Sequence, residues 1–170
     1  MTSGDRIVCR RVDVATILPL RHRVLRPGRP AETARFDGDE ADTTRHYAAV
    51  LDGEAIACLT LVAAAWEGHD AWQLRGMATD DRHRRTGIGS ALLSHALADV
   101  DTVTPGRPMW CNARIEVADF YRHHGWSIVS APFDIAGIGP HVRMERTEAR
   151  VLANPPCSRH SRPRSIPFAP

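Results

Sequence analysis

The stretch that decides the fold is residues 72–93, W-Q-L-R-G-M-A-T-D-D-R-H-R-R-T-G-I-G-S-A-L-L. Its apolar first part belongs to a strand that we predict over residues 71–79. A polar turn follows, and apolar residues then recur at helical spacing, which predicts an amphipathic helix over residues 87–100. The stretch therefore indicates a strand that passes through a glycine-containing turn into a helix.

The turn, residues 84–90 (R-R-T-G-I-G-S), has the composition of an anion-binding loop. Its two glycines lack the Cβ atoms that would hold a phosphate away from the backbone. Unpaired amides at the start of the helix, at the positive end of its dipole, would then point at the ligand. Arg84 and Arg85 add positive charge, and Ser90 adds a hydroxyl donor. The alternative interpretation is a helix start whose glycines only allow close packing against the strand.

The rest of the chain supplies further strands and helices around this stretch. A D-G pair at residues 52–53, between two apolar runs, predicts a β-hairpin. A first helix opens at Asp13 or Thr16, and with Thr16 as its cap Pro19 falls in the first turn, where proline is tolerated. Strands are expected over residues 7–12, 47–51, 55–65, 71–79, 108–113, 126–129 and 142–145, and later helices over residues 87–100 and 116–124. This order predicts an α/β domain in which a mixed sheet carries helices on both faces.

Length and composition indicate one soluble globular domain. The chain has 170 residues, 43% of them hydrophobic and 25% charged. Its formal net charge of +2 argues against nucleic acid or an anionic membrane as a partner. The four cysteines are widely spaced, and no secretory signal or membrane span is apparent, so we expect reduced thiols and a cytoplasmic location. Residues 1–147 are assigned to the domain and residues 148–170, rich in Pro and Arg, to a disordered tail.

Three motifs in this order resemble the GCN5-related N-acetyltransferase (GNAT) family. R-R-T-G-I-G resembles the family signature [QR]-x-x-G-x-[GA], with Arg84, Gly87 and Gly89 at its defined positions. The preceding L-R-G-M-A-T-D-D resembles the fourth strand of the family, and A-D-F-Y-R-H-H-G-W, residues 118–126, resembles its F-Y-x-x-x-G-[FW] element. The resemblance covers residues 5–147 and implies a single-domain GNAT-like fold with a mixed, mostly antiparallel sheet.

The resemblance implies that acetyl-CoA is the co-substrate. Backbone groups of Met77, Ala78 and Thr79 would pair with the pantetheine arm as an added strand does, and would polarise the thioester carbonyl. The pyrophosphate would lie on the turn, whose amides come from Arg85, Thr86, Gly87, Ile88, Gly89 and Ser90 and whose first arginine is Arg84.

Two positions depart from the family pattern. Many relatives carry an asparagine at the position of Arg114, and the nearby Asn112 is the candidate pantetheine contact in this chain. Many relatives also carry a glutamate on the fourth strand as general base, whereas Gln73 and Arg75 are the polar side chains of that strand here. The resemblance therefore leaves the general base unassigned.

Two side chains are candidates for the catalytic proton transfers. Tyr121 matches the tyrosine that protonates the departing CoA thiolate in many members, and a phenol keeps its proton at neutral pH. His141, at the start of the last strand, lies near where relatives place acceptor-binding residues, and it titrates in a range that suits a proton acceptor. The alternatives are a packing tyrosine and an ordinary surface histidine. His46 is open to the same two interpretations as His141.

Charged residues gather near the expected acceptor entrance. They form either a flexible, charged lid that recognises the acceptor or a solvated helix face followed by an ordinary loop. The residues concerned are Arg21, Arg23, Arg26, Arg29, Asp37, Asp39, Glu40 and Asp42.

The sequence predicts an acetyl-CoA-dependent N-acetyltransferase without a metal, in which a primary amine attacks the thioester directly. The acceptor is open between a small-molecule amine and a protein N-terminus, and the oligomeric state is open, a homodimer included. The alternative is a non-catalytic acyl-CoA-binding regulatory module with the same fold, which the missing strand-four glutamate favours.

Overall fold

The structure is a computed structural model that describes residues 7–146. The tail predicted over residues 148–170 lies outside the described residues. The elements are β1 (Val8–Val12), α1 (Val14–Leu25), η1 (Ala31–Ala34), β2 (Arg45–Leu51), β3 (Glu54–Trp66), β4 (His69–Thr79), η2 (Asp81–His83), α2 (Ile88–Val103), β5 (Met109–Arg114), η3 (Ile115–Val117), α3 (Ala118–Arg122), β6 (Trp126–Ile128), β7 (Phe133–Ile135) and β8 (Gly139–Arg146).

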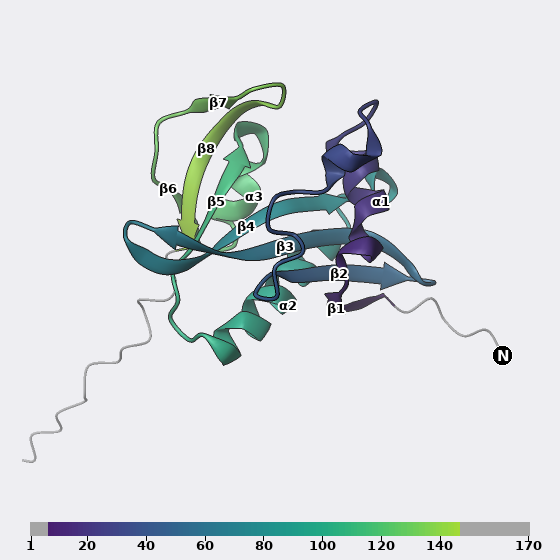
Figure 1. Cartoon of the computed structure of the whole chain (residues 1–170), viewed down its shortest axis with the longest axis horizontal. Helices are drawn as coiled ribbons and strands as arrows, with labels where there is room; N and C mark the ends of the chain where they lie inside the picture. Colours follow the sequence, from purple (N-terminus) through teal and green to yellow (C-terminus); the bar gives the residue numbers. More distant parts are fainter. Residues whose placement is uncertain (1–6, 147–170) are drawn as a thin grey trace, which may run out of the picture.

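All the strands belong to one mixed sheet (Figure 1). Its order is β1-β2-β3-β4-β5-β8-β6, and β7 pairs with β8 outside this path. Of these pairs only β4 and β5 run parallel; the others are antiparallel. The predicted mixed, mostly antiparallel sheet is confirmed.

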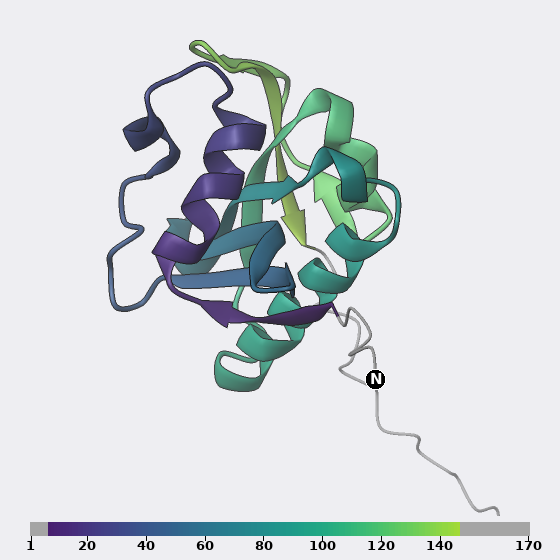
Figure 2. The ribbon, with the colours of Figure 1, turned by 90° about the vertical axis from the view of Figure 1, so that its right-hand side faces the viewer.

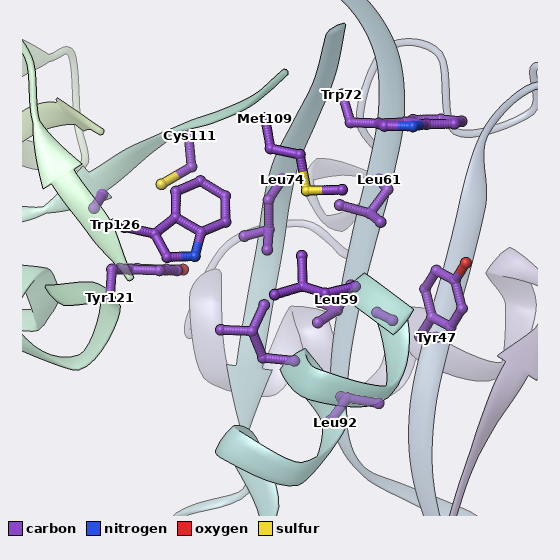
Figure 3. Packing of buried hydrophobic residues seen from close by; sticks show 14 of the residues in the cluster. Tyr47, Leu59, Leu61, Trp72, Leu74, Leu92, Met109, Cys111, Tyr121 and Trp126 are labelled. Atoms are coloured by element: carbon purple, nitrogen blue, oxygen red, sulfur yellow. The ribbon is translucent and has the colours of Figure 1, made fainter. Parts of the chain in front are cut away.

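The two long helices cover opposite faces of the sheet, as predicted (Figure 2). Residues of one strand alternate between the faces, so neighbouring residues join different cores. Tyr47 packs in the larger core with α2, whereas the next residue, Ala48, packs in the smaller core with Ile17 and Leu20 of α1. Figure 3 shows the larger core, with Tyr121, Trp126 and Cys111 at one end and Tyr47 at the other. We call the two sides of the sheet the α1 face and the α2 face.

A β-bulge in β4 separates this strand from β5. Leu59 of β3 lies opposite both Gly76 and Met77, since the register shifts between the pairs Thr60–Arg75 and Cys58–Ala78. Gly76 has a φ of 62°, as residues at such bulges do. Pairing between β4 and β5 ends at Leu74 and Cys111, although both strands continue. The bulge bends β4, and the two strands part in the middle of the sheet.

A buried ion pair supports the bulge from the α1 face. The side chains of Arg21 and Asp39 are both fully buried and lie 2.5 Å apart. Arg21 also donates to the Ala34 carbonyl at 3.0 Å and to the Thr60 hydroxyl at 2.6 Å. Its guanidinium stacks on Phe36 at 4.4 Å from the ring centre. Arg21 and Asp39 therefore fix the segment after α1 to the sheet, and neither belongs to a solvated lid or helix face.

His46 belongs to the same network and is not a surface residue. Its Nε2 donates to the Asp39 carbonyl at 2.9 Å, because a carbonyl can only accept. Its Nδ1 is then the acceptor for the Thr60 hydroxyl at 2.8 Å. Burial lowers the pKa of the His46 ring, which favours this neutral form. His46 thus has a structural role.

Asp13, one of the two predicted caps, is the N-cap of α1, so Pro19 lies inside the helix rather than in its first turn. Two further details correct the sequence analysis. The strand β7, Phe133–Ile135, is additional to the predicted strands. The helix predicted over residues 116–124 is shorter, because the 3-10 turn η3 precedes α3. The predicted hairpin is confirmed, with Asp52 and Gly53 at positive φ between β2 and β3.

We expect Gly76→Ala to destabilise the protein by about 1–3 kcal/mol, the usual range for a strained backbone position. A Cβ atom at Gly76 would lie 3.0 Å from Nε of Arg21 and 3.1 Å from the Phe36 ring, at a φ of 62°. Thermal unfolding measures the effect, since each kcal/mol shifts the Tm of a chain of this size by roughly 2–4 °C.

Gly53→Ala is the matched control for the backbone strain alone. Gly53 has a φ of 85°, but a Cβ atom there would meet nothing within 4 Å. Equal losses of Tm in the two variants would show that the contact with Arg21 contributes nothing at Gly76.

Candidate active site

A cleft of about 860 Å³ opens where β4 and β5 part. It is lined on one side by the turn before α2 and by α3, and on the other by the end of α1, the loop after it and the β7–β8 hairpin. The lining includes eleven of the thirteen predicted site residues, namely Met77, Ala78, Thr79, Arg84, Arg85, Gly87, Gly89, Ser90, Asn112, Tyr121 and His141.

The turn before α2 presents its backbone to the cleft. Gly87 is the N-cap of α2 and has a φ of 85°, a conformation that favours glycine. The first amides of α2 have no carbonyl partner within the helix. Arg85 is exposed beside them, whereas Arg84 forms an ion pair with Asp81 at 2.8 Å. The result is a set of free donors at the positive end of a long helix, an arrangement that binds anions.

Gly89 lies across the cleft from α3. A Cβ atom there would be 3.4 Å from the Thr79 hydroxyl, 3.6 Å from Met77 and 3.9 Å from Phe120. These are ordinary contacts, so the space beside Gly89 is narrow but not closed. A larger side chain would fill the passage between β4 and α3.

Two of the predicted residues do not line the cleft with their side chains. Ile88 packs in the larger core. The Thr86 hydroxyl donates to the His83 carbonyl at 2.6 Å and so stabilises the turn. Any contribution of these two residues to binding comes from their backbone amides.

Beyond the bulge, one edge of β4 is free. Ala78 and Thr79 pair with β3, while their other side faces the gap left by β5. An unpaired strand edge offers alternating N–H and C=O groups to an extended ligand. This edge runs from the bulge toward the turn before α2.

Tyr121 reaches the bulge from α3. The side chain is buried, and its hydroxyl lies 3.7 Å from the sulfur of Met77. Its ring packs edge-on against Phe120 and Trp126. Burial raises the pKa of the Tyr121 phenol, so the group stays protonated at neutral pH. A thioether is a weak acceptor, which leaves this proton available to a better one.

His141 lies on the other side of the sheet. Its neighbour in β8, Val142, packs in the larger core, so His141 points to the α1 face. The residue is 5% exposed, and its Nδ1 donates to the Gly139 carbonyl at 2.7 Å. Because a carbonyl only accepts, the neutral ring carries its lone pair on Nε2. The oriented ring lies in the wall of the cleft, so His141 is not an ordinary surface histidine.

The α1 face of the cleft is polar and basic. Cys111 and Ala113 pack in the larger core, so the alternate residues Asn112 and Arg114 of β5 lie on this face. Asn112 has a buried amide oxygen without a partner in the described part of the chain. Sequence reasoning missed the cleft positions of Phe36, Ile135 and Ile138. All three are apolar residues within short or irregular segments that carry no periodic signal.

The arginines near the entrance have different roles. Arg26 lines the cleft. Arg23 is exposed and pairs with Asp80 at 2.5 Å. Arg29 donates to the Gly137 carbonyl at 2.7 Å and so links the loop after α1 to the turn between β7 and β8. This bond joins two segments of the same wall of the cleft.

The buried cysteines are neutral thiols. Burial raises the pKa of Cys58 to about 12 and that of Cys111 to about 12. Cys9, Cys58 and Cys111 are unbridged, and none of the three lines the cleft. A thiol with so high a pKa is a poor nucleophile, so these residues do not suit covalent catalysis.

Within residues 7–146, no group of three or more His, Cys, Asp or Glu side chains is placed to hold a metal ion. No helix in the same range is long and apolar enough to cross a membrane.

Comparison with known proteins places this site in a family. The sequence profile of the acetyltransferase (GNAT) domain matches residues 42–128. The chain is 34% identical over 142 residues to the uncharacterised N-acetyltransferase YitI of Bacillus subtilis (strain 168), a match that covers 80% of this chain and 93% of the relative.

Solved structures show the same fold at lower identity. Escherichia coli ElaA superposes with a TM-score of 0.72 at 19% identity, covering 84% of this chain and all (100%) of ElaA. An aminoglycoside 6'-N-acetyltransferase complexed with coenzyme A superposes with a TM-score of 0.63 at 14% identity, covering 81% of this chain and 95% of that protein.

The parted strands, the glycine-containing turn before α2 and the sequence matches all lead to one conclusion. The chain is an acyl-transferring enzyme, and it belongs to the GNAT family of acetyltransferases.

Proposed function

We propose that the protein transfers an acetyl group from acetyl-CoA to a primary amine. The observation that carries this proposal is the gap between β4 and β5, which joins the α2 face to the α1 face. Anion-binding amides and Tyr121 lie on the α2 face, and His141 lies on the α1 face. Two substrates can therefore enter from opposite faces and meet within the gap.

The α2 face suits acetyl-CoA. The amides at the start of α2 would hold the pyrophosphate, with Arg85 beside it. Met77, Ala78 and Thr79 would pair with the amides of the pantetheine arm along the free edge of β4, which places the thioester near the bulge. Coenzyme A bound to the aminoglycoside 6'-N-acetyltransferase, a structural neighbour, supports this part of the proposal.

The residues of the gap suit direct transfer. His141 Nε2 would accept a proton from the ammonium form of the amine, and the nitrogen lone pair freed in this way would form the bond to the thioester carbonyl carbon. As the C–S bond breaks, the Tyr121 hydroxyl would give its proton to the departing thiolate, and the second proton that the nitrogen loses on forming the amide would restore the Tyr121 phenol through solvent. No side chain forms a covalent intermediate, in keeping with the neutral thiols of Cys58 and Cys111.

Gly89→Val should weaken CoA binding at least about tenfold, which corresponds to ~1.4 kcal/mol. The added methyl groups would fill the passage between Thr79, Met77 and Phe120. Calorimetric titration with CoA measures the loss. Ala91→Val, on the exposed side of the same helix, is the control for introducing a β-branched residue into α2. Equal CoA affinity in a folded Gly89→Val variant and the wild type would place the pyrophosphate elsewhere.

Tyr121→Phe should lower turnover by roughly 10²- to 10⁴-fold, the usual contribution of a positioned proton donor. The ring and its packing remain, so CoA affinity should change little. Single-turnover kinetics with a saturating amine measure the chemical step. Tyr47→Phe is the matched control, because its hydroxyl donates to Asp99 at 2.5 Å and lies outside the cleft. Full turnover in Tyr121→Phe would leave the phenol with a packing role only.

His141→Gln should lower kcat/KM for the amine by roughly 10²-fold or more at neutral pH, because the proton acceptor is removed. The deficit should shrink as the pH rises, because the amine is then already unprotonated. A pH profile of kcat/KM measures both effects, with His69→Gln, an exposed histidine at the start of β4, as the control. A constant deficit at all pH values would indicate a positioning role instead of base catalysis.

A further inference from the structure

The acceptor side of the cleft contains several guanidinium groups and little negative charge. Arg26, Arg75 and Arg114 line it, together with His141. Glu116 provides the one carboxylate among the described lining residues. The nearby Asp39 is fully buried; Arg21 binds it at 2.5 Å, and Arg75 lies 4.0 Å from it. Asp39 therefore compensates Arg21 and part of the charge of Arg75, and the charges of Arg26 and Arg114 remain to be balanced.

The three arginines are engaged to different degrees. Arg75 donates to the Asp37 carbonyl, so its guanidinium is held toward the loop after α1. Arg114 lies 3.9 Å from Glu116, whose side chain is 63% exposed, so the pair is loose and solvated. Within the described residues, the Arg26 guanidinium donates only to the carbonyl of its chain neighbour Leu25. Arg26 and Arg114 thus retain donors for a ligand.

Arg26 is held in an unfavourable electrostatic setting. It is half-buried, and its guanidinium lies 5.2 Å from the centre of the Phe36 ring. Partial burial, followed by repulsion from Arg29, Arg114 and Arg21, lowers the pKa of Arg26. Several cations crowded at one end of a cleft attract an anion, because the bound anion would relieve their repulsion.

The charge pattern selects among amines. A polycationic amine would need carboxylates in this wall, and the wall repels it. An amine that carries its own negative charge would place that charge on the guanidinium forks, which match carboxylate and phosphate oxygens. Its amino group would then lie toward His141, in the same wall.

We propose that the acceptor is an amine bearing an anionic group, a carboxylate or a phosphate, which Arg26 and Arg114 bind on the α1 face of the cleft. The proposal rests on the proposed N-acetyltransferase function and names its substrate class. Ile135 and Ile138 of the β7–β8 hairpin form the apolar part of the same wall, so the class includes anionic amines with a small apolar side chain.

The test compares matched amines with the full-length protein and acetyl-CoA. Alanine carries a carboxylate that alaninamide and ethylamine lack, and phosphoethanolamine carries a phosphate that ethanolamine lacks. Release of the CoA thiol gives kcat/KM for each probe. In at least one set, we expect kcat/KM of the amine with the anionic group to be about tenfold or more above that of the matched amine without it. The difference should come from a lower KM, because charge-assisted hydrogen bonds to arginine strengthen binding of the anionic amine. If the ratio of kcat/KM values is larger for alanine over alaninamide, the site binds a carboxylate. If it is larger for phosphoethanolamine over ethanolamine, the site binds a phosphate.

Arg26→Gln should abolish most of this preference, and Arg114→Gln tests the same site from β5 if the first variant is unstable. Arg35→Gln is the matched control, since Arg35 is exposed, pairs with Glu40 and lies outside the cleft lining. The Arg35→Gln variant should keep the wild-type preference.

Equal kcat/KM values within every matched set would overturn the anionic subsite and leave amine acetylation standing. No thiol release with any amine would overturn the proposed function as well.

Discussion

The interruption of β4 at Gly76 and Met77 is the constraint on which the rest of the structure depends. A continuous pair of parallel strands would fill the middle of the sheet with hydrogen bonds and leave no passage through it. The bulge ends the pairing with β5 at Leu74. It frees the backbone edge of β4, opens the cleft and brings the Tyr121 hydroxyl to within 3.7 Å of the Met77 sulfur. A local backbone feature thus produces both the free strand edge and the cleft.

The buried network on the α1 face maintains this interruption. Arg21 lies against Gly76, where a Cβ atom would come within 3.0 Å of its Nε. The same guanidinium binds Asp39 and Thr60. Breaking a buried pair by removing one partner typically destabilises a protein by about 3–5 kcal/mol, because the remaining charge is uncompensated. The segment after α1 is therefore fixed, and it holds Phe36 in the wall of the cleft.

The two faces of the sheet present different groups to the cleft. On the α2 face a helix start supplies neutral donors and a dipole, and Tyr121 remains a proton donor because burial raises its pKa. On the α1 face the ring of His141 is oriented through its Nδ1 bond to Gly139, and Arg26 and Arg114 add positive charge. The gap between β4 and β5 brings these groups from opposite faces into one cleft, and under the proposed function they act on one bond.

The sequence by itself determined most of the elements, the family and the turn before α2, because local periodicity, the D-G hairpin and contiguous motifs carry these features within a few residues. It missed β7 and overestimated the length of α3, since such short elements have too few residues to show a period. It did not determine which polar side chains are buried. Arg21 and His46 have the composition of solvated residues, and only contacts with Asp39 and Thr60, distant in sequence, place them inside. The isolated Gly76 was a usable signal, since a glycine within a strand often marks a bulge. The gathering of Arg26 and Arg114 in one wall was decided by the tertiary structure alone, because β-strand alternation and the packing of α1 set which side chains share a face.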